Sequence, residues 1–122
     1  MNKYFFIITT AFVLLIIDFL YLNLIKNYFY KQIRLVQGTN PTINIFGVIL
    51  CYIFLVFGLN YFILNKNKSV LDAFLLGIII YGVYETTNYS LLKNWSIVTV
   101  IMDTLWGGIL FALTTFIMKK MS

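Results

Sequence analysis

The sequence predicts an all-α integral membrane protein, an antiparallel four-helix transmembrane bundle with a short interfacial segment between spans one and two. Of its 122 residues, 61% are hydrophobic and only 11% are charged, against roughly 25% charged in an ordinary soluble domain. The hydrophobic residues gather in four runs, and each reaches the length of about 20 residues that a helix needs to cross a bilayer. The runs cover residues 4–25, 43–64, 70–89 and 95–118. We therefore expect residues 1–122 to form one multi-pass membrane domain.

The first run, residues 4–25, is interrupted by Asp18 and Asn23. It is longer than the apolar core of a usual signal peptide, and no clear small-residue cleavage site follows it. These features favour a retained transmembrane span over a cleaved signal peptide.

The longest connection, residues 26–42, mixes aromatic, apolar and basic side chains. Such a mixture is typical of a short amphipathic helix that lies along the membrane surface. It also fits aromatic and basic residues that anchor the end of a span at the interface. Both interpretations stay open. Gly38 and Pro41 then mark a turn before the second run.

The second and third runs are joined by the polar residues 65–69. The second run carries no charge and is expected to be a plain span. Ser69 followed three residues later by Asp72 has the pattern of a capping box at the start of a helix. We therefore assign Asp72 to a helix end near one membrane surface.

The third run places its small and polar residues on one face. At about 100° per residue, these positions share an arc of about 120°. They are Ala73, Gly77, Tyr81, Tyr84, Glu85 and Asn88. A pair of small residues four apart lets a neighbouring helix approach closely, so this face is expected to point into the bundle.

The fourth run also has a polar face, within an arc of about 100°. It consists of Thr99, Asp103, Trp106, Gly107, Leu110 and Thr114. Gly108 and Ala112 lie on the opposite side as a second pair of small residues. Ordinary packing is the favoured interpretation of that pair, and a homo-oligomer contact is the alternative.

Three acids, Asp18, Glu85 and Asp103, fall within these runs. In an antiparallel bundle, the end of the first span, the end of the third and the start of the fourth lie on one side of the membrane. At about 1.5 Å rise per residue, the three acids lie at depths of roughly 10, 6 and 12 Å below that surface. We therefore expect them to meet.

Three neighbouring carboxylates cannot all stay ionised in a low dielectric, so a proton or a cation should accompany them. The candidates for proton or ligand binding are the acids and the donors near them. They are Asp18, Tyr21, Tyr81, Tyr84, Glu85, Asn88, Asp103 and Trp106, with Thr99 as a further local donor. No catalytic residue, metal ligand or cofactor is assigned, because the chain has no His and only Cys51.

The same residues resemble the motif set of a known family. The chain has, in order, Asp18-Phe19-Leu20-Tyr21-Leu22, Phe29-Tyr30, a central segment from Tyr81 to Asn88, Trp95, and Asp103-Thr104-Leu105-Trp106-Gly107. This set is similar, in order and spacing, to that of the small membrane-protein family catalogued as domain of unknown function 2177. The resemblance implies four spans and no established activity. Glu85 stands where the family usually has Asp, and Tyr21 where it often has Trp.

Two of these motifs also resemble each other, because both follow an Asp-x-Leu-aromatic pattern, at Asp18 and at Asp103. Internal repeats are common in transporters, but four residues are too few to establish a duplication.

Three hypotheses for function follow, in this order. The first is binding or transport of a proton, a small cation, or a basic or lipid headgroup at the acidic and aromatic cluster. The second is a structural or assembly protein whose acids only fix helix packing. The third, least favoured, is an intramembrane enzyme that uses the carboxyls as acid and base on a lipid. The lipid bilayer is the expected partner, and a homo-oligomer is an open alternative.

The net charge is +5, and the basic residues lie mostly between or beyond the apolar runs. That placement fits anionic lipid headgroups better than nucleic acid, for which no binding module is visible. Five basic residues fall on the side of the termini and four on the other side. The excess weakly favours both termini in the cytoplasm.

Overall fold

The computed structural model describes residues 2–122, and the regular structure within them is helical. The elements are α1 (Lys3–Gln37), α2 (Ile45–Leu59) with its π-helical extension η1 (Asn60–Leu64), α3 (Val70–Leu91) and α4 (Ile97–Met121). Each of α1, α2 with η1, α3 and α4 is long and apolar enough to cross a membrane. The predicted class, an all-α multi-pass membrane protein with four helices, is confirmed.

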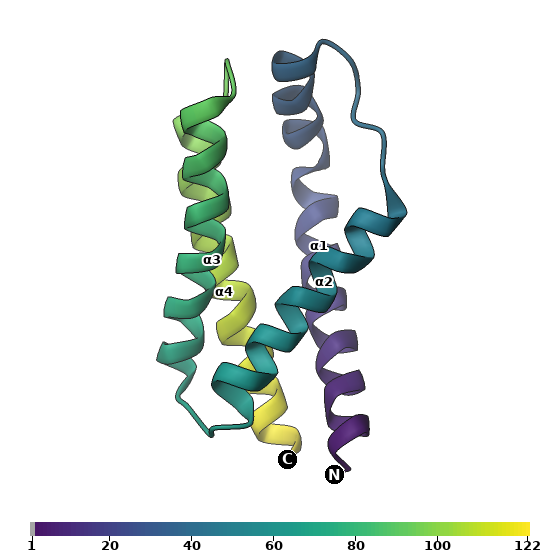
Figure 1. The fold of residues 1–122 in the computed structure, drawn as a ribbon, viewed down its shortest axis with the longest axis vertical. Coiled ribbons are helices and arrows are strands. Elements are labelled where there is room, and N and C mark those ends of the chain that lie inside the picture. Colours follow the sequence, from purple (N-terminus) through teal and green to yellow (C-terminus); the bar gives the residue numbers. More distant parts are fainter. Residues whose placement is uncertain (1) are drawn as a thin grey trace.

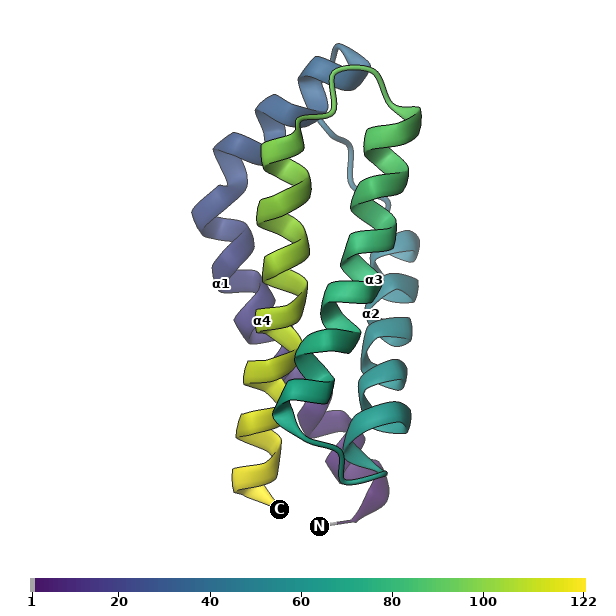
Figure 2. The same cartoon turned by 90° about the vertical axis from the view of Figure 1, so that its left-hand side faces the viewer.

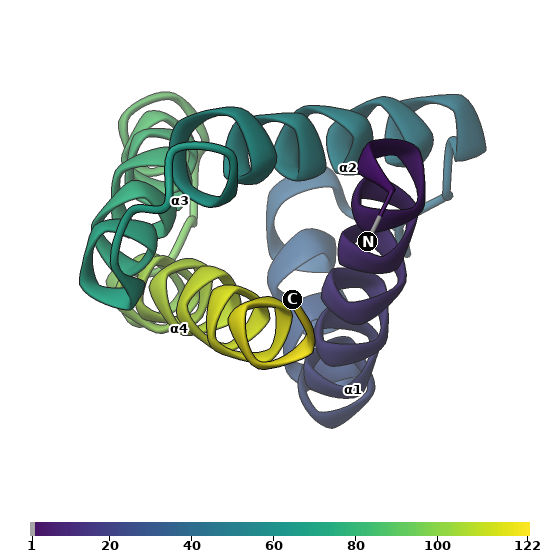
Figure 3. The same cartoon turned by 90° about the horizontal axis from the view of Figure 1, so that it is seen from below.

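Successive helices run in opposite directions, and both chain ends lie at the same end of the molecule (Figure 1). Helices α3 and α4 pack side by side along their length, and α1 packs against α4 and α2 (Figure 2). Helix α2 runs obliquely from the start of α3 towards α1, as the view from below shows (Figure 3). The acids of α1, α3 and α4 can therefore approach one another between these helices.

The first helix does not end near Ile25, where its hydrophobic run ends. It continues to Gln37 and stops at Gly38, whose φ of 82° lies in the left-handed region and whose amide donates to the Arg34 carbonyl. Glycine ends helices in this way because it lacks the Cβ that makes this conformation costly. The connection after the first hydrophobic run is thus helical as far as Gln37, as a direct extension of the first span.

The contact between α3 and α4 is made by glycines. A Cβ on Gly77 would lie 2.2 Å from the carbonyl oxygen of Gly107, and one on Gly108 would lie 2.7 Å from the Phe74 ring. Ala73 and Gly77 are buried, as predicted for the inward face of α3. Gly108 also packs on α3, which supports ordinary packing for that side of α4.

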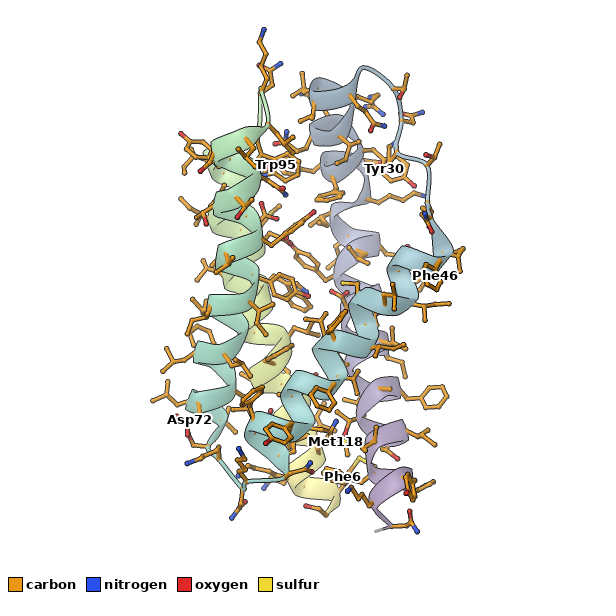
Figure 4. All side chains as sticks on the ribbon, viewed as in Figure 1. Phe6, Tyr30, Phe46, Asp72, Trp95 and Met118 are labelled. Atoms are coloured by element: carbon orange, nitrogen blue, oxygen red, sulfur yellow. The ribbon has the colours of Figure 1, made fainter. Side chains whose placement is uncertain are left out.

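The capping box at the start of α3 is also confirmed. Ser69 Oγ accepts from the Asp72 amide (3.0 Å), and the Asp72 carboxylate accepts from the Ser69 amide (3.3 Å). Asp72 lies at the end of the molecule opposite Trp95 (Figure 4). It is therefore separate from the other three acids.

The buried core is small, and large apolar side chains cover the outside of the bundle. Leu14, Leu59, Leu110 and Phe111 are fully buried, whereas Phe46 is 71% exposed and points away from the bundle (Figure 4). This distribution suits a helix bundle whose surroundings are hydrocarbon, since lipid tails solvate such side chains well.

Candidate functional site

Asp18 connects three helices through its two carboxyl oxygens. Its Oδ1 accepts a hydrogen bond from the indole Nε1 of Trp106 on α4 (2.8 Å), and its Oδ2 accepts one from the Tyr52 hydroxyl on α2. Asp18 itself is buried on α1. Both of its oxygens are thus satisfied by donors from neighbouring helices.

Asp103 on α4 is bound in turn by α1. Its Oδ1 accepts a hydrogen bond from the Tyr21 hydroxyl (3.2 Å). The Tyr21 ring stacks on the Trp106 ring, with centroids 4.2 Å apart and planes inclined by 5°. Each helix therefore presents an acid and an aromatic donor one turn apart, and the two pairs bind each other reciprocally. This reciprocal contact gives a physical meaning to the Asp-x-Leu-aromatic pattern that occurs twice in the sequence.

Glu85 on α3 is fully buried. Its Oε1 accepts a hydrogen bond from the indole Nε1 of Trp95 (2.9 Å). Its Oε2 is buried and has no hydrogen-bond partner among residues 2–122. The Asp103 carboxyl is a close neighbour of the Glu85 carboxyl. An unpartnered buried carboxyl oxygen is costly unless a proton or cation satisfies it.

The structure thus brings Asp18, Glu85 and Asp103 into one cluster together with Tyr21 and Trp106. The convergence expected from helix rise is observed. It arises because α1 and α3 run in the direction opposite to α4 (Figure 1), so that the later parts of α1 and α3 and the early part of α4 lie at similar heights along the bundle.

The remaining candidates on α3 lie at the edge of this cluster. The half-buried Tyr81 ring packs directly on Gly107, where a Cβ would lie 2.2 Å from the ring. Tyr84 is 53% exposed, and Asn88, one turn further along α3, is half-buried. Tyr84 departs from the predicted inward face because α2 turns away from this half of α3 towards α1 (Figure 1).

From its place on the polar face of α4, Thr99 was expected to donate a hydrogen bond to the acids, but it does not. It is buried, donates to Gln32 Oε1 (2.8 Å), and shares a hydrogen bond of 2.9 Å with the Tyr28 hydroxyl. Gln32 Oε1 also accepts from the Ser96 amide (3.0 Å), and its Nε2 donates to the Asn94 carbonyl (3.0 Å). The extension of α1 is therefore tied to the α3–α4 connection.

Sequence reasoning missed three residues that shape this region: Tyr52, Trp95 and Gln32. Tyr52 is a hydroxyl-bearing residue in a span without charges, and a lone hydroxyl gives only a weak indication that an acid on another helix binds it. Trp95 stood in the family motif but without an assigned partner. Gln32 carried no periodic signal, because its burial depends on α1 continuing past the membrane-spanning run.

Comparison with known families gives one match. The family model described as "Predicted membrane protein (DUF2177)" covers residues 3–119. The chain belongs to this family. Comparisons with curated proteins and with solved structures found no match. The family assignment agrees with the membrane-spanning helices and adds no activity.

Proposed function

We propose that this protein reversibly binds a proton between Glu85 and Asp103, inside the bilayer. One observation carries the proposal: Glu85 is fully buried, and its Oε2 has no hydrogen-bond partner among residues 2–122, although the Asp103 carboxyl is a close neighbour. A proton placed between two such carboxyls turns an electrostatic repulsion into a hydrogen bond.

A count of hydrogen bonds at the cluster supports this placement. The three acids have six carboxyl oxygens, and within residues 2–122 four donors reach them, Tyr21, Tyr52, Trp95 and Trp106. Both oxygens of Asp18 are filled. The two oxygens left over are one on Glu85 and one on Asp103, and a single shared proton satisfies both.

The donors around the cluster favour a proton over a metal cation. Most carboxyl oxygens are already occupied by indole and phenol groups, which a metal ion would have to displace. Residues 2–122 contain no group of three His, Cys, Asp or Glu side chains placed to hold a metal ion. A small organic cation or a basic headgroup is the remaining alternative for the same carboxyls.

The structural hypothesis fits Asp18 better than it fits the other two acids. Asp18 holds α1 to α2 and α4 with both of its oxygens, as an ionised carboxylate does. We infer a division of roles: Asp18 fixes the packing, whereas Glu85 and Asp103 carry the exchangeable proton.

Counting protons tests this proposal. Purified protein in liposomes is shifted from about pH 7, where exposed carboxyls are already ionised, to alkaline pH, and the released protons are measured with an indicator dye. The wild type should release one proton more per chain than Glu85→Gln or Asp103→Asn, because the amide of either variant supplies the missing donor without a titrating proton. Asp72→Asn, at the distant helix cap, should match the wild type.

Two results would overturn the proposal. The first is equal proton release from the wild type and both cluster variants. The second is saturable binding of sodium, potassium or methylammonium at neutral pH that disappears in Glu85→Gln, which would assign the site to a cation.

A further inference from the structure

An apolar groove of about 700 Å³ lies between α1 and α2, and it touches the carboxyl cluster only through Tyr52, which lines it and donates to Asp18. Its lining is almost entirely hydrophobic and includes Ile8, Leu15, Ile49 and Ile53, which are exposed on the outside of the bundle. The volume falls within the usual range for small-molecule sites. Because these helices cross a bilayer, the groove opens onto lipid and not onto water.

One end of the groove is basic. Lys3 and Asn65 line it near the chain end, together with Tyr61. The Lys66 ammonium lies 4.4 Å from the centroid of the Tyr61 ring, which holds this second lysine beside the same opening. Two positive charges thus stand where the groove meets the membrane surface. They complement a negatively charged headgroup.

Asn60 supplies a second, independent observation. Its side chain lines the groove and is only 3% exposed. Its Nδ2 donates to the Val56 carbonyl (3.0 Å), whereas its Oδ1 is buried without a partner among residues 2–122. The chain also changes here from α-helix to the π-helical η1, a rare geometry that is frequent at functional sites. An unsatisfied buried acceptor beside an apolar groove calls for a ligand that brings a hydrogen-bond donor.

We propose that this groove binds an anionic phospholipid. One acyl chain lies along the apolar lining, the phosphate meets Lys3 and Lys66, and the Asn60 side chain rotates from its buried position so that its Oδ1 accepts from a headgroup hydroxyl. Phosphatidylglycerol combines these features, since it carries a negative phosphate and free hydroxyls. This site is independent of the proton-binding pair, because its polar end lies at the side of the chain termini.

Native mass spectrometry of the full chain, released from detergent, measures this binding. Phosphatidylglycerol should bind at least tenfold more tightly than phosphatidylcholine with the same acyl chains. The double substitution Lys3→Gln, Lys66→Gln should weaken phosphatidylglycerol by tenfold or more, since each basic residue near an anionic lipid contributes about fivefold. The double substitution Lys119→Gln, Lys120→Gln removes the same charge at the same end and should bind as the wild type does, because neither lysine lines the groove and their ammonium groups contact Asn67 and Phe116, which do not line it either.

Two further variants test where the acyl chain and the headgroup hydroxyl of the lipid bind. Ala11→Phe fills the middle of the groove and should lower the affinity for both phosphatidylglycerol and phosphatidylcholine. Asn60→Leu should lower the affinity for phosphatidylglycerol severalfold. It should leave the affinity for phosphatidylmethanol, an anionic lipid without a headgroup hydroxyl, unchanged. Circular dichroism confirms that each variant keeps its helices.

The proposal is overturned if phosphatidylglycerol and phosphatidylcholine bind equally. It is also overturned if removing Lys119 and Lys120 costs as much affinity as removing Lys3 and Lys66, because general attraction to a basic surface would then explain the binding. Unchanged affinity in Ala11→Phe would remove the groove from the account.

Discussion

Every acid of the cluster accepts a hydrogen bond from an aromatic side chain. Trp106 donates to Asp18, Tyr21 donates to Asp103, and Trp95 donates to Glu85. In hydrocarbon, an indole N–H or a phenol O–H has no water to bond with, so the acid and the donor each relieve the desolvation of the other. The aromatic residues therefore position the carboxyls while leaving one oxygen of Glu85 free.

Replacement of Asp18 tests the packing role of this residue. Asp18→Ala strands the Tyr52 hydroxyl and the Trp106 N–H, and each stranded buried donor costs about 1–3 kcal/mol. We expect the free energy of unfolding to fall by no more than that amount per donor, since hydrogen bonds between helices in membranes average under about 1 kcal/mol. Asp18→Asn, which keeps one acceptor, should lose less. Unfolding in mixed micelles measures both.

Asn23→Ala serves as the control on the same helix, because Asn23 is exposed and, among residues 2–122, its side chain bonds only to the Phe19 carbonyl of its own helix. A loss in Asn23→Ala as large as that in Asp18→Ala would mean that the contacts of Asp18 with other helices contribute nothing to stability.

The sequence was sufficient to place the acids but not all their partners. The positions of Asp18, Glu85 and Asp103 could be predicted because helix rise converts residue number into depth. The Tyr52 contact could not, because it depends on the oblique path of α2 across the bundle (Figure 3). No periodicity within the second run encodes that path.

At the level of elements, the ends of helices were harder to predict than their presence. Hydropathy predicts where a helix leaves hydrocarbon, and the first hydrophobic run ends near Ile25, well before the backbone of α1 stops being helical at Gln37. The physical stop is Gly38, and Gln32 then secures the extension against Ser96 and the Asn94 carbonyl. The capping box at Ser69 was predictable because a cap is a local chemical pattern.

The close approach of α3 and α4 gives the second prediction. In Gly77→Ala the new Cβ would lie 2.2 Å from the Gly107 carbonyl oxygen, so the two helices must separate. We expect a loss of about 1–3 kcal/mol, the usual cost of overpacking. Unfolding in mixed micelles measures this loss.

Gly58→Ala is the matched control, because a Cβ there meets nothing within 4 Å. An alanine within a helix is favoured over glycine by roughly 0.5–1 kcal/mol, so this variant should be neutral or slightly stabilised. Equal stability of the two variants would contradict the tight α3–α4 contact.

At the scale of the whole molecule, four antiparallel helices place both chain ends on one side (Figure 1). The basic residues of the termini and of the α2–α3 connection share that side, and Lys93 lies on the other. The carboxyl cluster lies in the half of the bundle nearer to Lys93. Under the weak positive-inside bias, this is the half that faces away from the cytoplasm.

Cysteine labelling in intact cells tests this topology. In a Cys51→Ser background, Asn2→Cys and Ser122→Cys should react with an impermeant thiol reagent only after the membrane is opened. Lys93→Cys should react in intact cells. Reaction at Asn2 and Ser122 in intact cells would reverse the orientation, and different behaviour of the two ends would contradict the antiparallel arrangement itself.

The central claim is that Glu85 and Asp103 share one proton while Asp18 is ionised. Infrared spectroscopy of the protein in hydrated bilayers at neutral pH tests it most directly, because a protonated carboxyl has its own carbonyl band. We predict one such band in the wild type, its loss in Glu85→Gln and in Asp103→Asn, and its retention in Asp72→Asn. The absence of the band in the wild type, or its survival in both cluster variants, would contradict the account.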